Sequence, residues 1–289
     1  MSQRPAWLNE DLYPFQSRFL AVRGCDVHYV DEGSGPILLM LHGNPTWSFL
    51  YRDIVKGLRQ RFRCIALDYP GFGLSRAPAG YEYTPREHAQ IVEQFLLALG
   101  LSGVTMMVHD WGGPIGLGVA ERHPDRFDAL VIGNTFAWPL HGTLRMEAFS
   151  RFLGGPIGRF LICRFNAFVN LVMPLGTKRR LPPEVMAAYR GPFSTRASRW
   201  PTYVFPREIL GSRDYLAEVE QGLRAVSHLP TLIVWGEGDA AFQAPERRRF
   251  EQLFPGRRTV LLHGARHYIQ EDAGGEITDA ILDWWDNRG

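Results

Sequence analysis

The chain has 289 residues, of which 45% are hydrophobic and 21% charged, and its formal net charge at pH 7 is +2. This is the composition of an ordinary globular protein, long enough for one large domain or for one domain that carries an insertion. A charge so close to neutrality gives no indication of a nucleic-acid partner, and we expect none.

The three cysteines, Cys25, Cys64 and Cys163, lie far apart and are odd in number, so they suggest neither a disulfide framework nor a paired metal motif. We therefore expect a reducing compartment, the cytoplasm, and no metal or cofactor. Residues 1–16 lack the apolar core and cleavage site of a signal peptide. No stretch approaches the roughly 18 uninterrupted apolar residues of a membrane-spanning helix.

Six apolar runs are predicted to be buried strands. Each is nearly continuous in apolar residues and ends in Gly, Asp, Asn or His, which is typical of strands covered on both faces in a parallel sheet. The runs are residues 36–43, 63–71, 104–110, 129–134, 230–239 and 258–267. Helical patterns separate the first four, at residues 48–61, 85–100 and 112–124. This alternation predicts an α/β fold with a mostly parallel central sheet flanked by helices.

The alternation stops after the fourth strand. The following residues are rich in Phe, Pro and Arg, which predicts a helical cap at 138–215, inserted between two parts of a core domain, 1–137 and 216–289. Residues 140–215 hold twelve Lys or Arg against four Asp or Glu, a net charge of +8 that leaves −6 for the rest of the chain. The simplest interpretation is a solvated basic surface. The very apolar stretch 152–176 is expected to form pocket wall and core, or else a surface for self-association or membrane contact.

An aspartate, Asp110, stands where the third strand breaks into a helix. Asp is a favoured helix N-cap, and the Gly-rich "GGPIGLG" that follows is a weak match to a dinucleotide-binding loop. Ligands of open parallel sheets, however, meet the carboxyl ends of the strands. Asp239 ends the fifth predicted strand and His267 ends the sixth. We therefore expect all three side chains to meet at one edge of the sheet.

The chain order Asp110, Asp239, His267 is the order nucleophile, acid, histidine of the α/β-hydrolases, with aspartate where serine is usual. The sequence His-Gly-x-Pro that begins at His42 resembles the oxyanion loop of that fold. The chain thus resembles the α/β-hydrolase superfamily along nearly its whole length, although Val108 stands where many members carry Gly.

Within this superfamily, "HDWGG" around Asp110 and "HGNP" around Asn44 resemble the haloalkane dehalogenases, and residues 189–209 resemble that family's cap. The resemblance implies that the side chains of Asn44 and Trp111 hold the departing halide, and that their backbone N–H groups form the oxyanion hole. It also implies a catalytic triad of Asp110, His267 and Asp239.

Three further residues near these motifs receive weaker interpretations. The alternative strand end for the acid, at 134–135, offers only Asn and Thr, so the acid is Asp239, with Glu237 as a nearby rival. His42 and His109 are expected to be structural partners of the turn and not bases.

The implied reaction explains why an aspartate stands at the turn. A carboxylate can displace halide from a saturated carbon and leaves an ester, which water can cleave with His267 as base and Asp239 orienting it. A serine would leave an ether, which an oxyanion hole cannot help to cleave. The expected activity converts a small apolar haloalkane and water to an alcohol, halide and a proton. An apolar pocket strengthens these electrostatic effects, and five cap residues are expected to line it: Phe149, Phe152, Phe160, Phe165 and Phe168.

Other functions remain open at this point. An epoxide hydrolase would use the same Asp110 but needs two cap tyrosines, for which Tyr189 and Tyr203 are available. A haloacid dehalogenase would need arginines next to the nucleophile, where the chain has Trp111. A cofactor-free oxygenase or luciferase would keep the triad, whereas a non-enzymatic binding protein would be expected to have lost part of it. Self-association through the cap is the expected protein contact.

Overall fold

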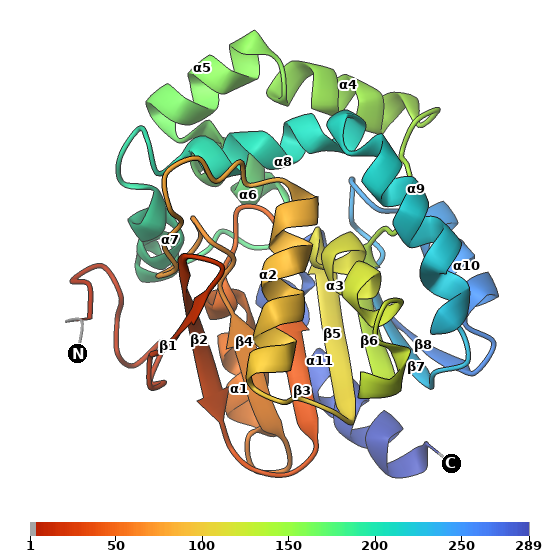
Figure 1. The fold of residues 1–289 in the computed structure, drawn as a ribbon. Coiled ribbons are helices and arrows are strands. Elements are labelled where there is room, and N and C mark those ends of the chain that lie inside the picture. Colours follow the sequence, from red (N-terminus) through yellow and green to blue (C-terminus); the bar gives the residue numbers. More distant parts are fainter. Residues whose placement is uncertain (1–3, 289) are drawn as a thin grey trace.

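The fold is built on one twisted sheet of eight strands (Figure 1). A computed structural model describes residues 4–288. The strands lie in the order β1-β2-β4-β3-β5-β6-β7-β8; β1 pairs with β2 and β2 with β4 antiparallel, and all other pairs are parallel. Their bounds are β1 Arg18–Val22, β2 Cys25–Glu32, β3 Ile37–Leu41, β4 Arg63–Leu67, β5 Val104–Asp110, β6 Phe127–Thr135, β7 Thr231–Gly236 and β8 Arg257–Leu262.

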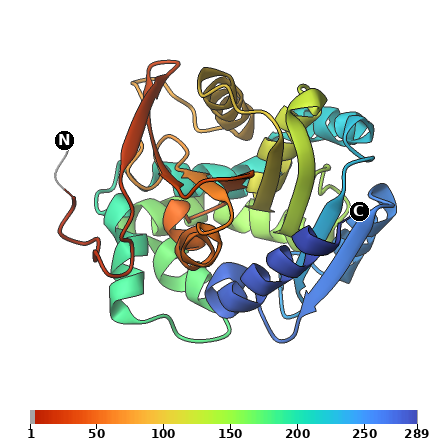
Figure 2. The same cartoon turned by 90° about the horizontal axis from the view of Figure 1, so that it is seen from below.

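Helices cover both faces of the sheet, as expected for an α/β fold with a mostly parallel central sheet. On one face α1 packs against α11, and on the other α2 packs against α3 and α3 against α9 (Figure 2). α10 contacts β7. The bounds are α1 Arg52–Leu58, α2 Pro85–Ala98, α3 Gly112–Ala120, α9 Arg213–Gly222, α10 Ala244–Leu253 and α11 Ile269–Asn287.

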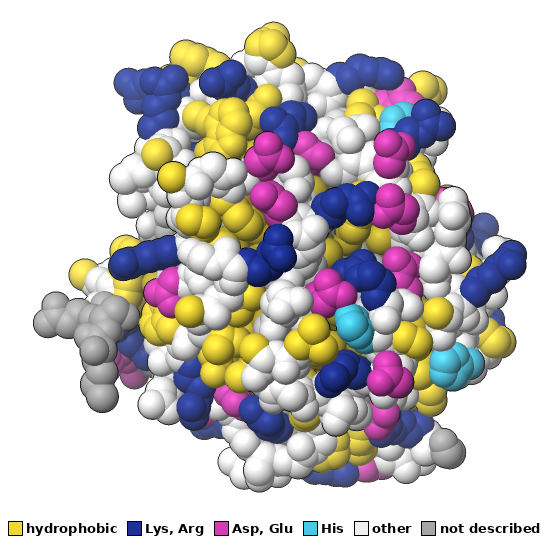
Figure 3. All heavy atoms as spheres, viewed as in Figure 1, with side chains coloured by type: hydrophobic (Ala, Val, Ile, Leu, Met, Phe, Trp, Pro, Cys, Tyr) yellow, Lys and Arg dark blue, Asp and Glu magenta, His cyan; other side chains and the backbone are white. Residues whose placement is uncertain are grey.

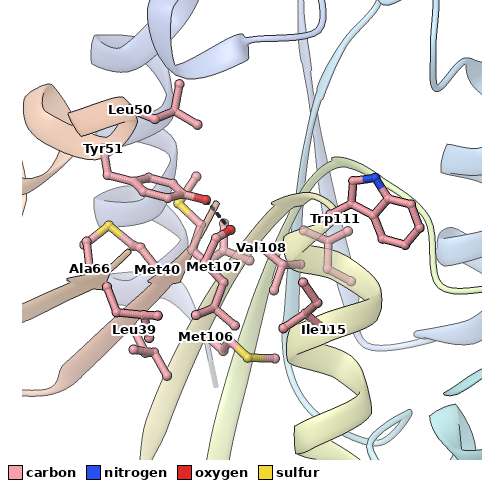
Figure 4. Packing of buried hydrophobic residues seen from close by; sticks show 14 of the residues in the cluster. Leu39, Met40, Leu50, Tyr51, Ala66, Met106, Met107, Val108, Trp111 and Ile115 are labelled. Atoms are coloured by element: carbon pink, nitrogen blue, oxygen red, sulfur yellow. Dashed lines mark hydrogen bonds between the residues drawn. The ribbon is translucent and has the colours of Figure 1, made fainter. Parts of the chain in front are cut away.

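The central strands are buried along their length, as their near-continuous apolar runs predict. Figure 4 shows Met40 of β3 beside Met107 and Val108 of β5, with Ile115 of α3 packed beneath the turn that joins strand to helix. The hydroxyl of Tyr51 donates to the backbone carbonyl of Leu41, 2.7 Å away, at the end of β3. This packing fixes the carboxyl ends of β3 and β5 relative to each other.

The segment between β6 and β7 carries helices that lie over the carboxyl ends of the strands (Figure 1). They are α4 Leu144–Leu153, α5 Pro156–Phe165, α6 Met173–Leu175, α7 Pro183–Arg190 and α8 Trp200–Gly211. A π-helical turn at Phe168–Val172 precedes α6. We call these helices and their connections the cap. The boundaries 138–215 for the cap, and 1–137 with 216–289 for the core, stay a prediction.

Two features differ from the sequence-based expectation. The strands β1 and β2 were not among the six predicted. β1 lies at the sheet edge and is mostly exposed, and β2, although mostly buried, has polar residues among its apolar ones and so lacks a continuous apolar run. The expected helix at 48–61 is a 3-10 turn, Ser48–Tyr51, followed by the short α1. Within residues 4–288, no single helix has the length and apolar character to cross a membrane, although the pair Pro156–Phe165 and Phe168–Leu175, bent by 85°, passes that test together.

A buried ion pair of the core accepts a hydrogen bond from the cap. Arg52 of α1 donates to both carboxylate oxygens of Glu271 in α11, with one contact of 2.8 Å, and the two side chains are almost fully enclosed. The hydroxyl of Tyr189, in α7, donates to the same carboxylate. Removal of Arg52 or Glu271 would leave a buried charge without compensation. These three side chains should therefore contribute strongly to the stability of the fold where the cap meets the core.

We expect Arg52→Met to lower the free energy of unfolding by about 3 kcal/mol, because the Glu271 carboxylate would stay buried without its partner. Urea denaturation followed by tryptophan fluorescence measures the change. Arg61→Met is the matched control: Arg61 makes a similar two-bonded pair with Asp286, but the two side chains are 48% and 50% exposed. Water screens that pair, so its loss should move the denaturation midpoint little. Equal midpoints for the two variants would contradict the role of the buried pair.

Candidate active site

The candidate site is centred on a sharp turn at Asp110, the last residue of β5. Its backbone is left-handed, with φ +51°, which is unfavourable for a residue with a side chain. The hydroxyl of Thr135, at the end of β6, donates to the carbonyl of Asp110 and holds the turn. A side chain at Gly112 would collide with the backbone of Leu41, so the glycine lets α3 start close against β3. The N-cap of α3 is Trp111, which excludes the interpretation of Asp110 as a helix cap.

The two carboxylate oxygens of Asp110 lie in different surroundings. Oδ1 accepts a hydrogen bond of 2.8 Å from the backbone N–H of Asn44, and the N–H of Trp111 also stabilises the carboxylate. Oδ2 lies 3.5 Å from Nε2 of His267. Burial by itself would raise the pKa of Asp110, but the hydrogen bond and charge of His267 and the N–H of Trp111 hold it below its usual range. Asp110 is therefore an anion held in a fixed orientation.

The imidazole of His267 lies between two carboxylates. Its Nδ1 is 3.0 Å from Oδ2 of Asp239, and its Nε2 faces Asp110. Burial would lower the pKa of His267, but the charge of Asp239 and the contacts with Asp110 outweigh it and raise this pKa to about 10. The structure thus brings Asp110, His267 and Asp239 together, as the strand-end argument predicts.

Asp239 is itself held by two donors. Its Oδ1 accepts 2.6 Å from the backbone N–H of Ala241, and its Oδ2 accepts 2.9 Å from the side-chain amide of Asn134. Asn134 also bonds the backbone of Gly236 in both directions, at 2.7 and 3.1 Å, which fixes the exit of β7. The rival acid Glu237 points elsewhere and lies 2.5 Å from the exposed His263. The geometry therefore favours Asp239 as the partner of His267.

Two further histidines support the turn without facing the cavity described below. Nε2 of His109 lies 2.7 Å from the backbone carbonyl of His267 and fixes the position of that residue. Nδ1 of His42 is 2.9 Å from the carbonyl of Gly43, and its Nε2 accepts 3.1 Å from the N–H of Tyr69. Burial lowers the pKa of both imidazoles to about 4, which keeps them neutral. This agrees with their interpretation as structural partners.

A cavity of about 320 Å³ lies between the triad and the cap. Its walls are mostly apolar, and at its floor lie Asp110, Asn44 and Trp111. The prediction for the cap phenylalanines is right for two and wrong for three. Phe149 and Phe168 line the cavity, whereas the side chains of three others point to solvent because they lie on the outer faces of α4 and α5: Phe152, Phe160 and Phe165. The apolar wall is completed by residues of other elements, chiefly Phe136, Val172, Ile209 and Phe242.

The side chains of Asn44 and Trp111 reach the cavity from the loop after β3 and the turn after β5. The indole of Trp111 stacks on Phe205 and meets the edge of Phe136, with ring centroids 5.2 and 5.0 Å away. These contacts fix the plane of the indole, and both Trp111 and Asp110 line the cavity. The amide Nδ2 of Asn44 donates to the carbonyl of Thr202 in α8, at 3.1 Å, and keeps a second N–H.

The two cap tyrosines that an epoxide hydrolase would need do not line this cavity. Tyr189 donates to Glu271 beneath the cap, and Tyr203 donates 3.0 Å to the carbonyl of Gly154 within the cap. The tyrosine that does line the cavity is Tyr268, whose hydroxyl donates 3.1 Å to the carbonyl of Asn44. Among residues 4–288, no cluster of three His, Cys, Asp or Glu side chains is arranged to hold a metal ion.

Comparison with known proteins agrees with this geometry. Residues 36–274 match the family model of the alpha/beta hydrolase fold. Haloalkane dehalogenase 2 of Mycobacterium bovis is 45% identical over 274 residues, which cover 94% of this chain and 96% of that protein. The chain belongs to the haloalkane dehalogenase family. Its members are hydrolases, and the crystal structure of the haloalkane dehalogenase DbeA from Bradyrhizobium elkani superposes with a TM-score of 0.85 at 29% identity, covering 93% of this chain and 97% of that one.

A second group of relatives is similar to this haloalkane dehalogenase. The cis-3-alkyl-4-alkyloxetan-2-one decarboxylase of Shewanella oneidensis is 36% identical over 282 residues, which cover 94% of this chain and 89% of that protein. The name of that relative denotes action on a small strained lactone. The same scaffold thus serves two reactions among the relatives of the dehalogenase.

We expect Asp239→Asn to lower kcat for haloalkane hydrolysis by about 10³-fold or more, because the amide would favour the wrong tautomer of His267 and would not stabilise an imidazolium. Glu237→Gln is the matched control, two residues away. It should keep close to wild-type turnover because the Glu237 carboxylate bonds to the exposed His263 and not to His267. Halide release from 1,2-dibromoethane measures both. Normal turnover by Asp239→Asn with loss in Glu237→Gln would transfer the role of the acid to Glu237.

Proposed function

We propose that this protein cleaves the carbon–halogen bond through a covalent alkyl-aspartate intermediate. The observation that supports this most is the difference between the two oxygens of Asp110: Oδ1 receives the N–H of Asn44 at 2.8 Å, whereas Oδ2 faces His267 at 3.5 Å. Oδ2 attacks the saturated carbon, the carbon–halogen bond breaks, and the halide leaves with the electron pair. Oδ1 becomes the carbonyl oxygen of the ester and already occupies the oxyanion hole.

The ester is then hydrolysed at the same site. Water attacks Cγ of Asp110 while Nε2 of His267 accepts its proton, and negative charge develops on Oδ1. The backbone N–H groups of Asn44 and Trp111 stabilise that charge, an effect worth on the order of 3 kcal/mol per donor in comparable sites. Collapse of the intermediate releases the alcohol and regenerates the carboxylate of Asp110. The net products are alcohol, halide and a proton.

The first step prepares His267 for the second. With both carboxylates charged, the pKa of His267 is raised to about 10, so the free enzyme holds a protonated imidazole at neutral pH. Alkylation neutralises Asp110 and removes one of the two anions that raise this pKa. The pKa of His267 then falls, the proton is lost, and the imidazole becomes a base at the moment when the ester needs one.

The departing halide is held by side chains at the cavity floor. The indole N–H of Trp111 and the second amide N–H of Asn44 donate to it, and the enclosed apolar walls strengthen both bonds because water is excluded. The positions of the cap tyrosines Tyr189 and Tyr203 favour this assignment over an epoxide hydrolase, which needs donors at the opposite side of the cavity. We propose the cytoplasm as the compartment, since all three cysteines are free thiols.

His267→Phe should trap the intermediate, because alkylation needs no base whereas hydrolysis does. After addition of 1-iodobutane, intact-mass analysis should show one added butyl group, and peptide mapping should place it on Asp110. The double variant Asp110→Ala/His267→Phe is the control and should gain no mass, while Asp110→Ala alone should release no halide. Steady turnover by His267→Phe, or an adduct on a different residue, would contradict the mechanism.

The decarboxylase relatives make ring-opening of a strained lactone the second candidate, because a carboxylate nucleophile can also attack the saturated C–O carbon of such a ring. Wild-type protein assayed side by side with 1,2-dibromoethane, 1-iodobutane, styrene oxide and a cis-dialkyl oxetan-2-one separates the candidates. The proposed function requires halide release to be the fastest of these reactions.

We further propose that the protein self-associates through the outer side of the cap. Seven large apolar side chains of the cap are between 54% and 82% exposed, of which Leu175 also lines the cavity: Leu144, Phe152, Ile157, Phe160, Phe165, Leu171 and Leu175. Figure 3 shows apolar side chains interspersed with Lys and Arg at this end of the molecule. A monomer rarely leaves so much apolar surface in water. The cap carries a net +8 and the rest of the chain −6, so the cap of one copy suits the core of another.

Phe160→Ser should therefore reduce the molar mass of the assembly in size-exclusion chromatography with light scattering. Phe19→Ser removes an exposed phenylalanine of β1, outside the cap, and should leave the mass unchanged. If charge pairing contributes, rising salt should also weaken association; if apolar burial dominates, salt should matter little. A monomeric wild type at micromolar concentration in both low and high salt would contradict self-association.

A further inference from the structure

The cap helix α8 contains a proline in its interior, Pro206. In an α-helix each backbone N–H donates to the carbonyl four residues earlier, and proline has no N–H. The carbonyl that loses its donor through Pro206 is that of Thr202. Thr202 is fully buried, so this carbonyl cannot turn to water and would carry the cost of an unsatisfied polar group.

The missing donor is supplied by Asn44. Its Nδ2 lies 3.1 Å from the carbonyl oxygen of Thr202, so a side chain from the loop after β3 completes the hydrogen bonding of a cap helix. The rest of Asn44 is also held: its backbone N–H donates to Asp110 and its carbonyl accepts from Tyr268. The side-chain oxygen of Asn44, by contrast, is buried and has no partner among residues 4–288. The bond to Thr202 is therefore what orients the amide among the described residues.

From this geometry we propose that Pro206 is a positioning residue for halide binding, because it keeps the carbonyl of Thr202 free to orient the amide of Asn44. If the amide turned over, its oxygen would face the Thr202 oxygen, and two acceptors would repel each other. The same turn would remove amide N–H groups from the halide and place oxygen beside an anion. The proposal rests on the halide-binding role of Asn44 stated above.

Restoring a backbone N–H at position 206 should make the orientation of the Asn44 amide less well fixed. In Pro206→Ala or Pro206→Val the new N–H donates along the helix to the Thr202 carbonyl and competes with Asn44, so the amide of Asn44 is less well oriented. Loss of one such hydrogen bond corresponds to about a three- to tenfold change in a binding constant. Helix formation itself should not suffer, since Ala and Val are better accommodated in a helix interior than Pro.

The test is the affinity for bromide alone, measured as saturable quenching of tryptophan fluorescence, with Trp111→Phe to identify the signal of Trp111. Bromide is a single ion, so its affinity reports on the donors more than on the shape of the apolar wall. The control Ile209→Val changes the cavity wall on the same helix without altering the backbone. Far-UV circular dichroism confirms that each variant is folded, and Asn44→Ala reports on the underlying role of Asn44.

The proposal predicts that Pro206→Ala and Pro206→Val weaken bromide binding alike, by about three- to tenfold. The affinity of Ile209→Val should stay within about twofold of wild type. Asn44→Ala should lose at least as much affinity as either proline variant. Wild-type affinity in both proline variants, with loss in Asn44→Ala, would overturn the role of Pro206 alone. A loss confined to one proline variant would assign the effect to cavity shape and overturn it as well. Wild-type affinity in Asn44→Ala would overturn the halide role of Asn44 and this inference with it.

Discussion

The left-handed backbone of Asp110 is the constraint on which the site depends. At φ +51° the chain turns from β5 into α3 within one residue, so the carboxylate projects from the sheet edge into the cavity. Such a conformation persists only where the surroundings enforce it. Here they include the hydroxyl of Thr135 on the Asp110 carbonyl and the close approach of Gly112 to the backbone of Leu41. The glycines of "HDWGG" are thus needed for space and not for binding a phosphate.

Electrostatics at the site follow from placing one imidazole between two carboxylates. Asp239 keeps its position through donors from Ala241 and Asn134, and it forms no covalent bond in the proposed cycle. Asp110 alternates between anion and ester, so it alone changes the field at His267. A serine nucleophile could not act in this way, because its resting state carries no negative charge. In the proposed cycle, the aspartate therefore determines which leaving group can be displaced and also at which step His267 becomes a base.

The sequence predicts which residues lie at neighbouring strand ends, but it does not predict which of their atoms form hydrogen bonds. Asp110, Asp239 and His267 could be predicted to meet, because parallel strands bring their carboxyl ends to one edge. The supporting bonds of Asn134 and His109 could not, since the strand-end pattern gives the shared edge but not the rotamers and backbone carbonyls that set individual bonds. A polar residue at the end of a buried strand indicates that its side chain has a hydrogen-bond partner, but it does not identify that partner.

The same limit explains the errors in the cap and at the sheet edge. Phenylalanines in the cap could be recognised as apolar, but which of them face the cavity depends on how α4 and α5 lie on the core, and Phe152, Phe160 and Phe165 face outward. The strands β1 and β2 were missed because neither has the continuous apolar run of the central strands: β1 is mostly exposed at the sheet edge, and β2 mixes polar with apolar residues although most of it is buried. Both errors concern features that depend on tertiary packing and not on the local sequence pattern.

Several hydrogen bonds that join the cap to the core involve residues that line the cavity. The backbone N–H of Tyr268, next to His267, donates 2.9 Å to the carbonyl of Gly176 in the cap, and the indole N–H of Trp47 donates 3.1 Å to the carbonyl of Ala188. Asn44 spans the same boundary, with its backbone on the nucleophile and its amide on α8. Cap motion that admitted substrate would therefore also disturb the donors that hold the halide. In the proposed mechanism, product release and halide affinity would therefore be linked, because the bond between Asn44 and Thr202 both orients a halide donor and joins the cap to the core.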